Sequence, residues 1–276
     1  MRDPIRLVER RLWRNGCLSD GFRSIPEETA IALTYNGGTY AVMMGTAQDL
    51  ADFAVGFSLT ERIVQTPEDI LSLEIVDFGD GVELQMWLAQ AKADRLNERR
   101  RHIAGPTGCG ICGIDSIAEA LRPAVVVGRG KIFSSRELMA AIQSLPPQQT
   151  INIETRAVHA AAFWTPANGI VALREDVGRH NALDKLAGAL ARAGIRASDG
   201  MVLLTSRVST EMVQKAAAMG GAVMVAVSAP TALAVRMAEA AGITLAAIAR
   251  SDGFEIFTHP DRITSATLRK RAVHVA

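Results

Sequence analysis

The stretch MVLLTSRVSTEMVQKAAAMGGAVMVAV, residues 201–227, decides the class of fold. Residues 201–204 form a short apolar run, which is typical of a buried strand. Residues 209–219 have the polar and apolar spacing of a helix, and Gly220 and Gly221 end it. Residues 222–227 form a second apolar run. A strand, a helix and another strand in this order indicate an α/β unit, in which helices cover a layered sheet.

The same alternation continues on both sides of this stretch. Upstream elements are predicted at 134–145 (helix, opened by the capping box of Ser134 and Glu137), 170–173 (strand) and 181–192 (helix). Downstream elements are predicted at 231–241 (helix), 243–248 (strand) and 254–257 (strand). We therefore predict a C-terminal α/β domain over residues 121–276, a layered sheet with helices on both faces.

The first part of the chain has a different pattern. Asn36 and Gly37 separate two apolar runs, 31–35 and 40–44, and Asn-Gly at this place predicts a hairpin. Thr46 is then the expected N-cap of a helix, and strands are expected at 73–78 and 82–88. Residues 1–30 are polar and show few periodic signals. These features predict an α+β domain over residues 1–120.

That first domain ends in a C-x-x-C motif. Cys109 and Cys112 lie among Gly108, Gly110 and Gly113, and glycine beside a thiol leaves the sulfur uncovered. A basic helix predicted over 92–104 could lower the thiol pKa, and a thiolate is the reactive form. We interpret the pair as a reactive sulfur site; the alternative is a structural pair. Cys17 has no partner in the sequence and is interpreted as a bystander.

Two other uses of the C-x-x-C motif fit poorly. A closed zinc site needs four ligands, and the sequence has no second pair at metal-binding spacing. Zinc deaminases use H-x-E before P-C-x-x-C, whereas here His159 lacks the glutamate and follows the cysteines. A thioredoxin-like disulfide exchanger would place the motif between a strand and a helix of its own fold, which three glycines and the downstream α/β half do not favour.

Three polar segments follow predicted strands, where α/β proteins bind ligands. Residues 174–185 include Arg179 and His180, residues 205–211 include Ser206 and Arg207, and residues 248–253 form a polar loop. Arginine, hydroxyl groups and a helix N-terminus are suited to anions. The alternative for each segment is structural: a salt-bridged helix start, a capped helix, or an ordinary surface loop.

Composition narrows the classes of function. The 276 residues carry a formal net charge of +1, which argues against general nucleic-acid binding. The sequence lacks an apolar run near 18 residues, so we expect no membrane span. Three cysteines in a chain of this length do not make a disulfide framework, and we expect a reducing, cytoplasmic compartment.

Four blocks together resemble the formate dehydrogenase accessory sulfurtransferase family, known as FdhD. They are residues 107–113, 175–185, 206–215 and 258–260, and the similarity extends from about Ile31 to Arg262. The resemblance implies a sulfurtransferase that accepts persulfide sulfur from a cysteine desulfurase. The acceptor would be the molybdenum cofactor, as bis-molybdopterin guanine dinucleotide, before it enters formate dehydrogenase.

The resemblance also implies particular residues and partners. Cys109 would carry the persulfide and Cys112 would assist. The cofactor would bind along the segment Ile248, Ala249, Arg250, Ser251, Asp252 and Gly253, to which the polar segments above add Arg179, His180, Ser206 and Arg207. A cytoplasmic homodimer with a cytidine-deaminase-like C-terminal domain is expected, and GDP would mimic the cofactor. The alternative function is a non-enzymatic chaperone that binds and delivers the cofactor.

Overall fold

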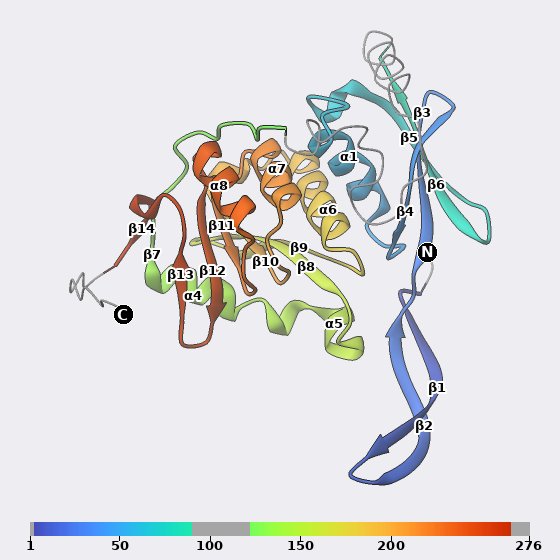
Figure 1. Ribbon diagram of the computed structural model, residues 1–276. Coiled ribbons are helices and arrows are strands. Elements are labelled where there is room, and N and C mark those ends of the chain that lie inside the picture. Colours follow the sequence, from blue (N-terminus) through green and yellow to red (C-terminus); the bar gives the residue numbers. More distant parts are fainter. Residues whose placement is uncertain (1–2, 90–121, 266–276) are drawn as a thin grey trace.

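The structure is a computed structural model that describes residues 3–89 and 122–265. Two layered units lie side by side, and a long two-stranded arm projects from one of them (Figure 1). Cys109, Cys112, the predicted basic helix and the proposed domain boundary near residue 120 lie outside the described residues. These four predictions therefore stay predictions.

The first unit is a four-stranded sheet with one helix on its inner face. Its strands are β3 (Thr29–Tyr35), β4 (Gly38–Gly45), β5 (Ile70–Asp77) and β6 (Gly81–Leu88), in the order β4-β3-β6-β5. Asn36 and Gly37 have φ of 48° and 78°, so the predicted hairpin turn is confirmed. Helix α1 (Leu50–Thr60) packs Phe53 and Phe57 against the sheet.

The predicted start of α1 is wrong. The N-cap is Asp49, in a left-handed conformation, and not Thr46. Thr46 is fully buried, its backbone N–H donates to the Asp176 carboxylate at 3.0 Å, and its hydroxyl accepts from the N–H of Val177. A long-range contact with the second unit therefore replaced the local capping interaction.

The arm is the feature that the sequence reading missed. β1 (Ile5–Arg14) and β2 (Cys17–Pro26) pair along their whole length around a turn at Asn15 and Gly16, which have φ of 52° and 81°. Both faces of the arm are largely in solvent, so neither strand shows the alternation of a half-buried strand. The one local sequence signal for this hairpin is the pair Asn15-Gly16, a dipeptide that favours tight β-turns.

The second unit is a six-stranded sheet between helices, as predicted. Its strands are β8 (His159–Thr165), β9 (Gly169–Asp176), β10 (Met201–Leu204), β11 (Val223–Ala226), β12 (Thr244–Arg250) and β13 (Gly253–Ile256), in the order β13-β12-β11-β10-β8-β9. β10, β11 and β12 are parallel, and β8 and β13 run antiparallel to their neighbours. The finer resemblance to cytidine deaminase stays a prediction.

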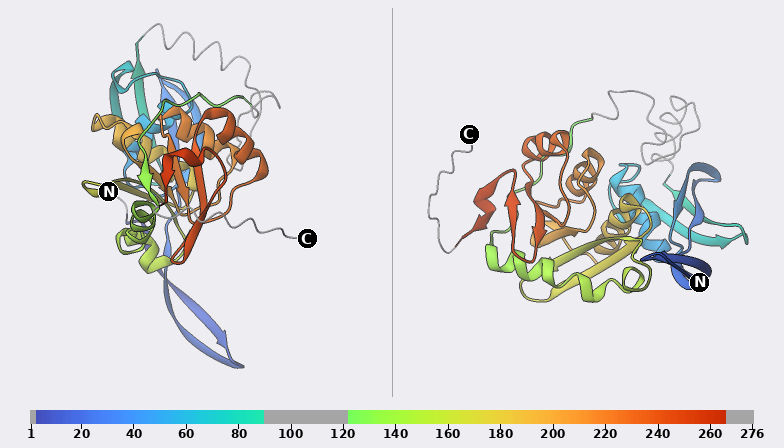
Figure 2. Two further views of the ribbon diagram at one scale, coloured as in Figure 1. Left: turned by 90° about the vertical axis from the view of Figure 1, so that its left-hand side faces the viewer. Right: turned by 60° about the horizontal axis from the view of Figure 1, so that its bottom comes forward.

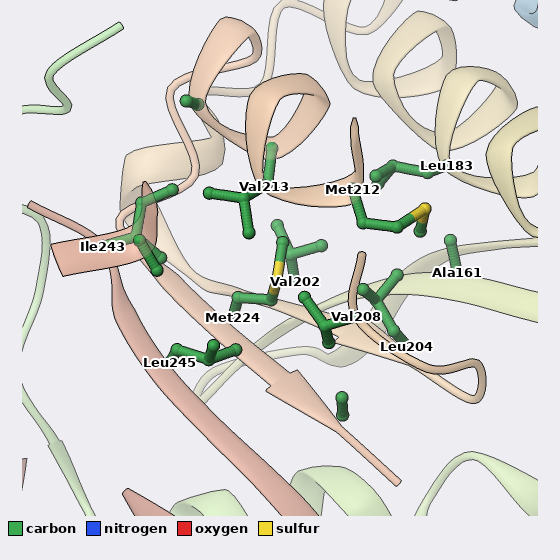
Figure 3. Close-up of a cluster of buried hydrophobic side chains, with 14 of the residues drawn as sticks. Ala161, Leu183, Val202, Leu204, Val208, Met212, Val213, Met224, Ile243 and Leu245 are labelled. Carbon is green, nitrogen blue, oxygen red and sulfur yellow. The ribbon is translucent and has the colours of Figure 1, made fainter. Parts of the chain in front are cut away.

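Helices cover both faces of this sheet (Figure 2). On one face lie α6 (Arg179–Arg192), α7 (Thr210–Ala218) and α8 (Ala232–Ala241). Figure 3 shows their buried side chains, among them Leu183 and Met212, packed over Val202 and Leu245 of the strands. On the other face, α4 (Ser135–Gln143) packs Leu138 against the sheet, and the predicted capping box between Ser134 and Glu137 is present.

Short elements complete the two units. The first has the 3-10 turn η1 (Pro67–Asp69). The second has α5 (Thr150–Thr155), the two-residue strands β7 (Phe133–Ser134) and β14 (Ile263–Thr264), and the 3-10 turns η2 (Pro146–Gln148), η3 (Ala197–Asp199) and η4 (Pro260–Arg262). Among the described residues, no helix is long and apolar enough to cross a membrane.

The two units meet where α1 crosses α6. A Cβ atom added to Gly56 would lie 1.7 Å from the backbone oxygen of Asp184, and one added to Gly188 would lie 1.9 Å from the oxygen of Asp52. Only glycine allows the two helix backbones to approach this closely. The crossing of α1 and α6 therefore fixes the position of one unit against the other.

Candidate functional site

The polar segments predicted as ligand-binding lie at one edge of the six-stranded sheet. β9, β10 and β12 all end there, because β9 runs in the same direction as the parallel strands, and β8 begins there. The segments 174–181, 205–210 and 248–253 follow these three strand ends. Strands that are separated in the sequence thus bring the predicted segments to a shared edge.

Four basic side chains gather at this edge: His159, Arg179, His180 and Arg207, here called the cationic edge. His159 pairs with Asp176 across β8 and β9, and the next residue, Ala160, donates its N–H to the Thr205 hydroxyl at 2.8 Å. Burial lowers the pKa of His159, and the charges of Arg179, His180 and Arg207 lower it further. A neutral imidazole therefore faces two guanidinium groups.

The cationic edge contains buried polar atoms that make no hydrogen bond within the described ranges. Arg179 Nε, His180 Nε2 and Ser209 Oγ are buried and make no hydrogen bond there. Helices α6 and α7 also begin here; the N-cap of α6 is Gly178, which has no side chain, and the Ser209 side chain at the N-cap of α7 makes no capping bond. Free donors, two helix N-termini and positive charge together suit an oxyanion such as a phosphate.

One acidic group balances part of this charge. Glu211 Oε2 lies 3.8 Å from His180 Nε2, a distance that fits an ion pair but not a hydrogen bond. His180 is the main cause that lowers the pKa of Glu211 to about 2. Glu211 thus stays ionised and holds the His180 ring beside the start of α7.

The predicted residues at 205–207 divide into two roles. Ser206 is 3% exposed, and its hydroxyl donates to the backbone oxygen of Arg207, so it does not face a ligand. Thr205 ties the start of β8 to the end of β10 through its hydroxyl. Arg207 is exposed and carries the positive charge of this segment.

Most of the block 175–185 builds the joint between the two units and does not face the cationic edge. Lys185 is fully buried, and its Nζ lies 2.6 Å from Asp176 Oδ2 and 2.8 Å from the backbone oxygen of Thr46. Asp184 accepts from Lys215 and from Thr60 of α1. The structural alternative therefore describes Lys185 and Asp184, whereas the functional role predicted for Arg179 and His180 stays a prediction.

The predicted cofactor segment forms the turn between β12 and β13. Ile248 has φ of 53°, which is strained for a β-branched side chain, and the pairing with β13 shifts register between Ala247 and Arg250. Ala249 is fully buried, whereas Arg250, Ser251 and Asp252 are exposed and Gly253 is half-buried. Backbone strain of this kind clusters at active sites and ligand-binding sites, where the surrounding structure keeps a residue in an unfavourable conformation.

The block 258–260 is structural. Thr258 is buried, and its hydroxyl donates to the oxygen of Ile243 at 2.6 Å and accepts from the N–H of Leu245 at 3.0 Å. These bonds fasten the chain after β13 to the start of β12. His259 Nε2 lies 2.8 Å from the oxygen of Glu239, at the end of α8.

A polar pocket of about 330 Å³ lies beside β9, between the loop before α1 and the start of α5. Arg174 lines it, but its guanidinium is bound to Asp52 at 2.6 Å. Glu175 also lines it, and its carboxylate accepts from the N–H groups of Ile151 and Asn152. Both charged groups of this part of the predicted segment 174–185 are therefore paired within the protein, and Arg179 and His180 do not line the pocket.

Neither cysteine of the C-x-x-C motif is within the described residues, so the structure does not place Cys109 or Cys112 against the cationic edge. Cys17 is described, and it is an exposed free thiol near the end of the arm. Within residues 3–89 and 122–265, no group of three or more His, Cys, Asp or Glu side chains could hold a metal ion.

These features define an α/β protein with a cationic sheet edge, and its sequence carries a C-x-x-C motif. Comparison with known proteins gives the family: the model described as the FdhD/NarQ family matches residues 26–264, and the chain belongs to this family.

Relatives and a solved structure agree with this assignment. A protein of Agrobacterium fabrum named "Sulfur carrier protein FdhD" is 53% identical over 94% of this chain and 96% of its own length. A protein of the same name from Brucella abortus is 54% identical over 87% and 90%. The crystal structure of a putative formate dehydrogenase accessory protein from Desulfotalea psychrophila is 22% identical, with a TM-score of 0.76, and covers 95% of this chain and 100% of that one.

Proposed function

We propose that this chain is a cytoplasmic sulfur carrier for the maturation of formate dehydrogenase. Cys109 accepts persulfide sulfur from a cysteine desulfurase, and the acceptor is the bis-molybdopterin guanine dinucleotide form of the molybdenum cofactor. The observation that carries the proposal is the family membership, with relatives named sulfur carriers at 53% and 54% identity. The C-x-x-C motif supplies the thiols.

The loading step needs no other reagent. The Cys109 thiolate attacks the terminal sulfur of the donor persulfide, a new S–S bond forms on Cys109, and the donor cysteine leaves as a thiolate. Delivery of this sulfur as sulfide needs two electrons. Cys112 can supply them by attacking Cys109 and forming a disulfide, which would explain why the motif has two cysteines.

The cationic edge supplies the binding chemistry for the acceptor. A guanine dinucleotide carries pyrophosphate groups, and arginine binds phosphate oxygens in pairs. The buried Arg179 Nε and Ser209 Oγ, which make no hydrogen bond among the described residues, fit such a group. The exposed turn with Arg250, Ser251 and Asp252 borders the same sheet edge. The bound cofactor supplies the molybdenum that receives sulfur, and these residues bind and orient it.

We expect GDP to bind the purified protein more tightly than CDP does. Arg179→Ala and Arg207→Ala should each weaken GDP binding by about 10-fold to 100-fold, because each removes a charge-assisted hydrogen bond of roughly 1.5–3 kcal/mol. Arg250→Ala should act in the same direction. Isothermal titration calorimetry measures the affinities, and Arg136→Ala, on the exposed surface of α4, is the matched control. Equal binding of GDP and CDP would contradict a guanine site.

The affinity for GDP should rise as the pH falls through the pKa that His159 has in the complex, and it should level off below the lowered pKa of His159 in the free protein. Free His159 has a lowered pKa and is neutral near pH 7, whereas a bound phosphate raises this pKa and favours the protonated ring. Binding therefore takes up a proton between the two pKa values. Calorimetry in two buffers of different ionisation enthalpy measures this proton. His159→Gln should remove it, and His259→Gln, outside the cationic edge, should not.

A further inference from the structure

The polar pocket beside β9 runs along a free edge of the six-stranded sheet. β9 is the last strand in the sheet order, and no strand of the described residues pairs with its outer side. Residues 170–175 of this strand line the pocket, which has a volume of about 330 Å³. Six residues of a strand span roughly 17–20 Å at a rise of about 3.4 Å per residue. The pocket is therefore an elongated groove beside a strand, here called the β9 groove.

The backbone of β9 has groups that point into the β9 groove. Ala160 turns its backbone toward β10, since its oxygen accepts from the N–H of the residue that follows β10 at 3.1 Å. The backbone of the next residue, Ala161, therefore faces β9, where it pairs with Arg174. By the same alternation, the N–H and C=O groups of Leu173 and Glu175 point outward. Neither of these two N–H groups donates to another described residue.

A bond within β9 supports this orientation. The oxygen of Leu173 accepts from Arg174 Nη1 at 2.8 Å, so it does not pair with β8, and a carbonyl oxygen has a second lone pair for another donor. The register of β9 against β8 shifts at residue 171, so the regular part of the edge is 172–175. This part has the length of an added strand of about four residues.

Two walls enclose the edge, one on each face of the sheet. One wall is the loop before α1, with Asp49, and the other is the start of α5, with Thr150. The side chain of Arg174 reaches Asp52 of α1, whereas that of its neighbour Glu175 accepts from N–H groups of α5. Successive side chains of a strand point to opposite faces, so the two walls lie on opposite faces. The β9 groove is therefore open in the direction in which a further strand would pair.

Asp49 gives the β9 groove an available negative charge. Its side chain is 38% exposed and lies 3.5 Å from Arg174 Nε, but this nitrogen already donates to Asp52 at 2.8 Å. The Asp49 carboxylate makes no hydrogen bond at the N-terminus of α1, where it is the N-cap. A lysine or arginine of an occupant can therefore pair with it.

We propose that the β9 groove binds an extended peptide segment of a partner protein, which adds to β9 as a further strand and places a lysine or arginine beside Asp49. The N–H groups of Leu173 and Glu175 are two residues apart, about 7 Å, which is the repeat of the carbonyl groups along one side of an extended peptide. Addition of a strand to an open sheet edge uses these main-chain bonds for affinity and side-chain contacts for specificity.

The β9 groove lies next to the cationic edge. β9 ends at Asp176, which pairs with His159 of the cationic edge. A partner held along β9 is thereby placed beside that edge. This inference goes beyond the proposed sulfur transfer and does not depend on it.

Peptide display tests the β9 groove with a defined probe. A phage library of random dodecapeptides is selected on the full-length protein, and the selected peptides are synthesised with a fluorescein label for fluorescence anisotropy. We expect peptides in which a lysine or arginine stands among β-branched or aromatic residues, since these favour an extended strand. A selection that yields no binding peptide would overturn the proposal.

Two changes to the protein locate the bound peptide. Incorporation of the α-hydroxy acid of leucine at Leu173 turns the amide into an ester, which removes the outward N–H and keeps the side chain. It should weaken peptide binding by about 10-fold. Asp49→Asn should weaken it by about 5-fold, and replacing the basic residue of the peptide by norleucine should then cost nothing further. Glu154→Gln, in an exposed acidic residue of α5 outside the β9 groove, is the matched control.

The outcomes are distinct from those for sulfur transfer. Circular dichroism and thermal unfolding verify that the variants fold. Peptide binding that neither the ester at Leu173 nor Asp49→Asn weakens would overturn the proposal. A wild-type dimer that the ester dissociates would also overturn it, because the occupant would then be a second copy. Sulfur loading of Cys109 is measured independently, so a failure there would refute the sulfur carrier and leave the β9 groove standing.

Discussion

Cys109→Ala is expected to abolish persulfide loading while leaving GDP affinity nearly unchanged. The thiolate of Cys109 is the proposed sulfur acceptor, and the cationic edge is built from other residues. Incubation with a cysteine desulfurase and cysteine, followed by mass spectrometry, should show about +32 Da on the wild-type peptide and none on the variant. Stability should change by less than about 0.5 kcal/mol, as for a surface substitution.

Cys17→Ala is the matched control, because Cys17 is an exposed thiol in the arm. This variant should load sulfur like the wild type. Label found only on Cys17 or Cys112 would contradict the assignment of Cys109. If Cys109→Ala still supports active formate dehydrogenase in cells without the wild-type protein, the chain delivers the cofactor and does not transfer sulfur. Loss of GDP binding in a folded Cys109→Ala protein would show that the cysteine segment is part of the binding site.

Lys185→Met is expected to lower the free energy of unfolding by about 3–5 kcal/mol, because it leaves a buried carboxylate without its counter-ion. Lys185 is fully buried and 2.6 Å from Asp176. Methionine is apolar and similar in shape, so the variant removes the charge and the hydrogen bond to the backbone oxygen of Thr46 while most of the space stays filled. Urea unfolding, followed by circular dichroism, measures the change.

Two further variants make this test specific. Lys131→Met removes an exposed lysine and should change the free energy of unfolding by less than about 0.5 kcal/mol. Asp176→Asn combined with Lys185→Met removes both charges and should recover part of the loss, since no ionised group is then left unpaired. A loss below about 1 kcal/mol for Lys185→Met alone would show that water or another cation reaches Asp176.

The layered units could be predicted from the sequence because their signals are local and periodic. The turn at Asn36 and Gly37 and the alternation over 201–227 each depend on neighbouring residues. Thr46 was wrongly predicted as the N-cap of α1, because its hydroxyl accepts a hydrogen bond from the N–H of Val177, which is 131 residues away in the sequence. The arm was missed because exposure on both faces removes the pattern from which strands are read.

The candidate site could be predicted only in part. Arg179, His180 and Arg207 were identified from their places after strands, and these strands do end at one edge. Ser206 was also predicted, and the structure places its side chain in the interior, where its hydroxyl bonds to the backbone oxygen of Arg207; this packing has no signal in the sequence. His159 was considered only for deaminase chemistry. Its position beside two arginines follows from the antiparallel pairing of β8 with its neighbours, and no local pattern indicates this.

The close crossing of α1 and α6 has a consequence for how such chains can recombine. Gly56 of the first unit and Gly188 of the second each face the backbone of the other helix, and Thr60 shares Asp184 with Lys215. A chimera that joins the first unit of one relative to the second unit of another must keep both glycines and both sides of each ion pair. We therefore expect the two units to be exchangeable between relatives only as one block, although each has a sheet and a core of its own.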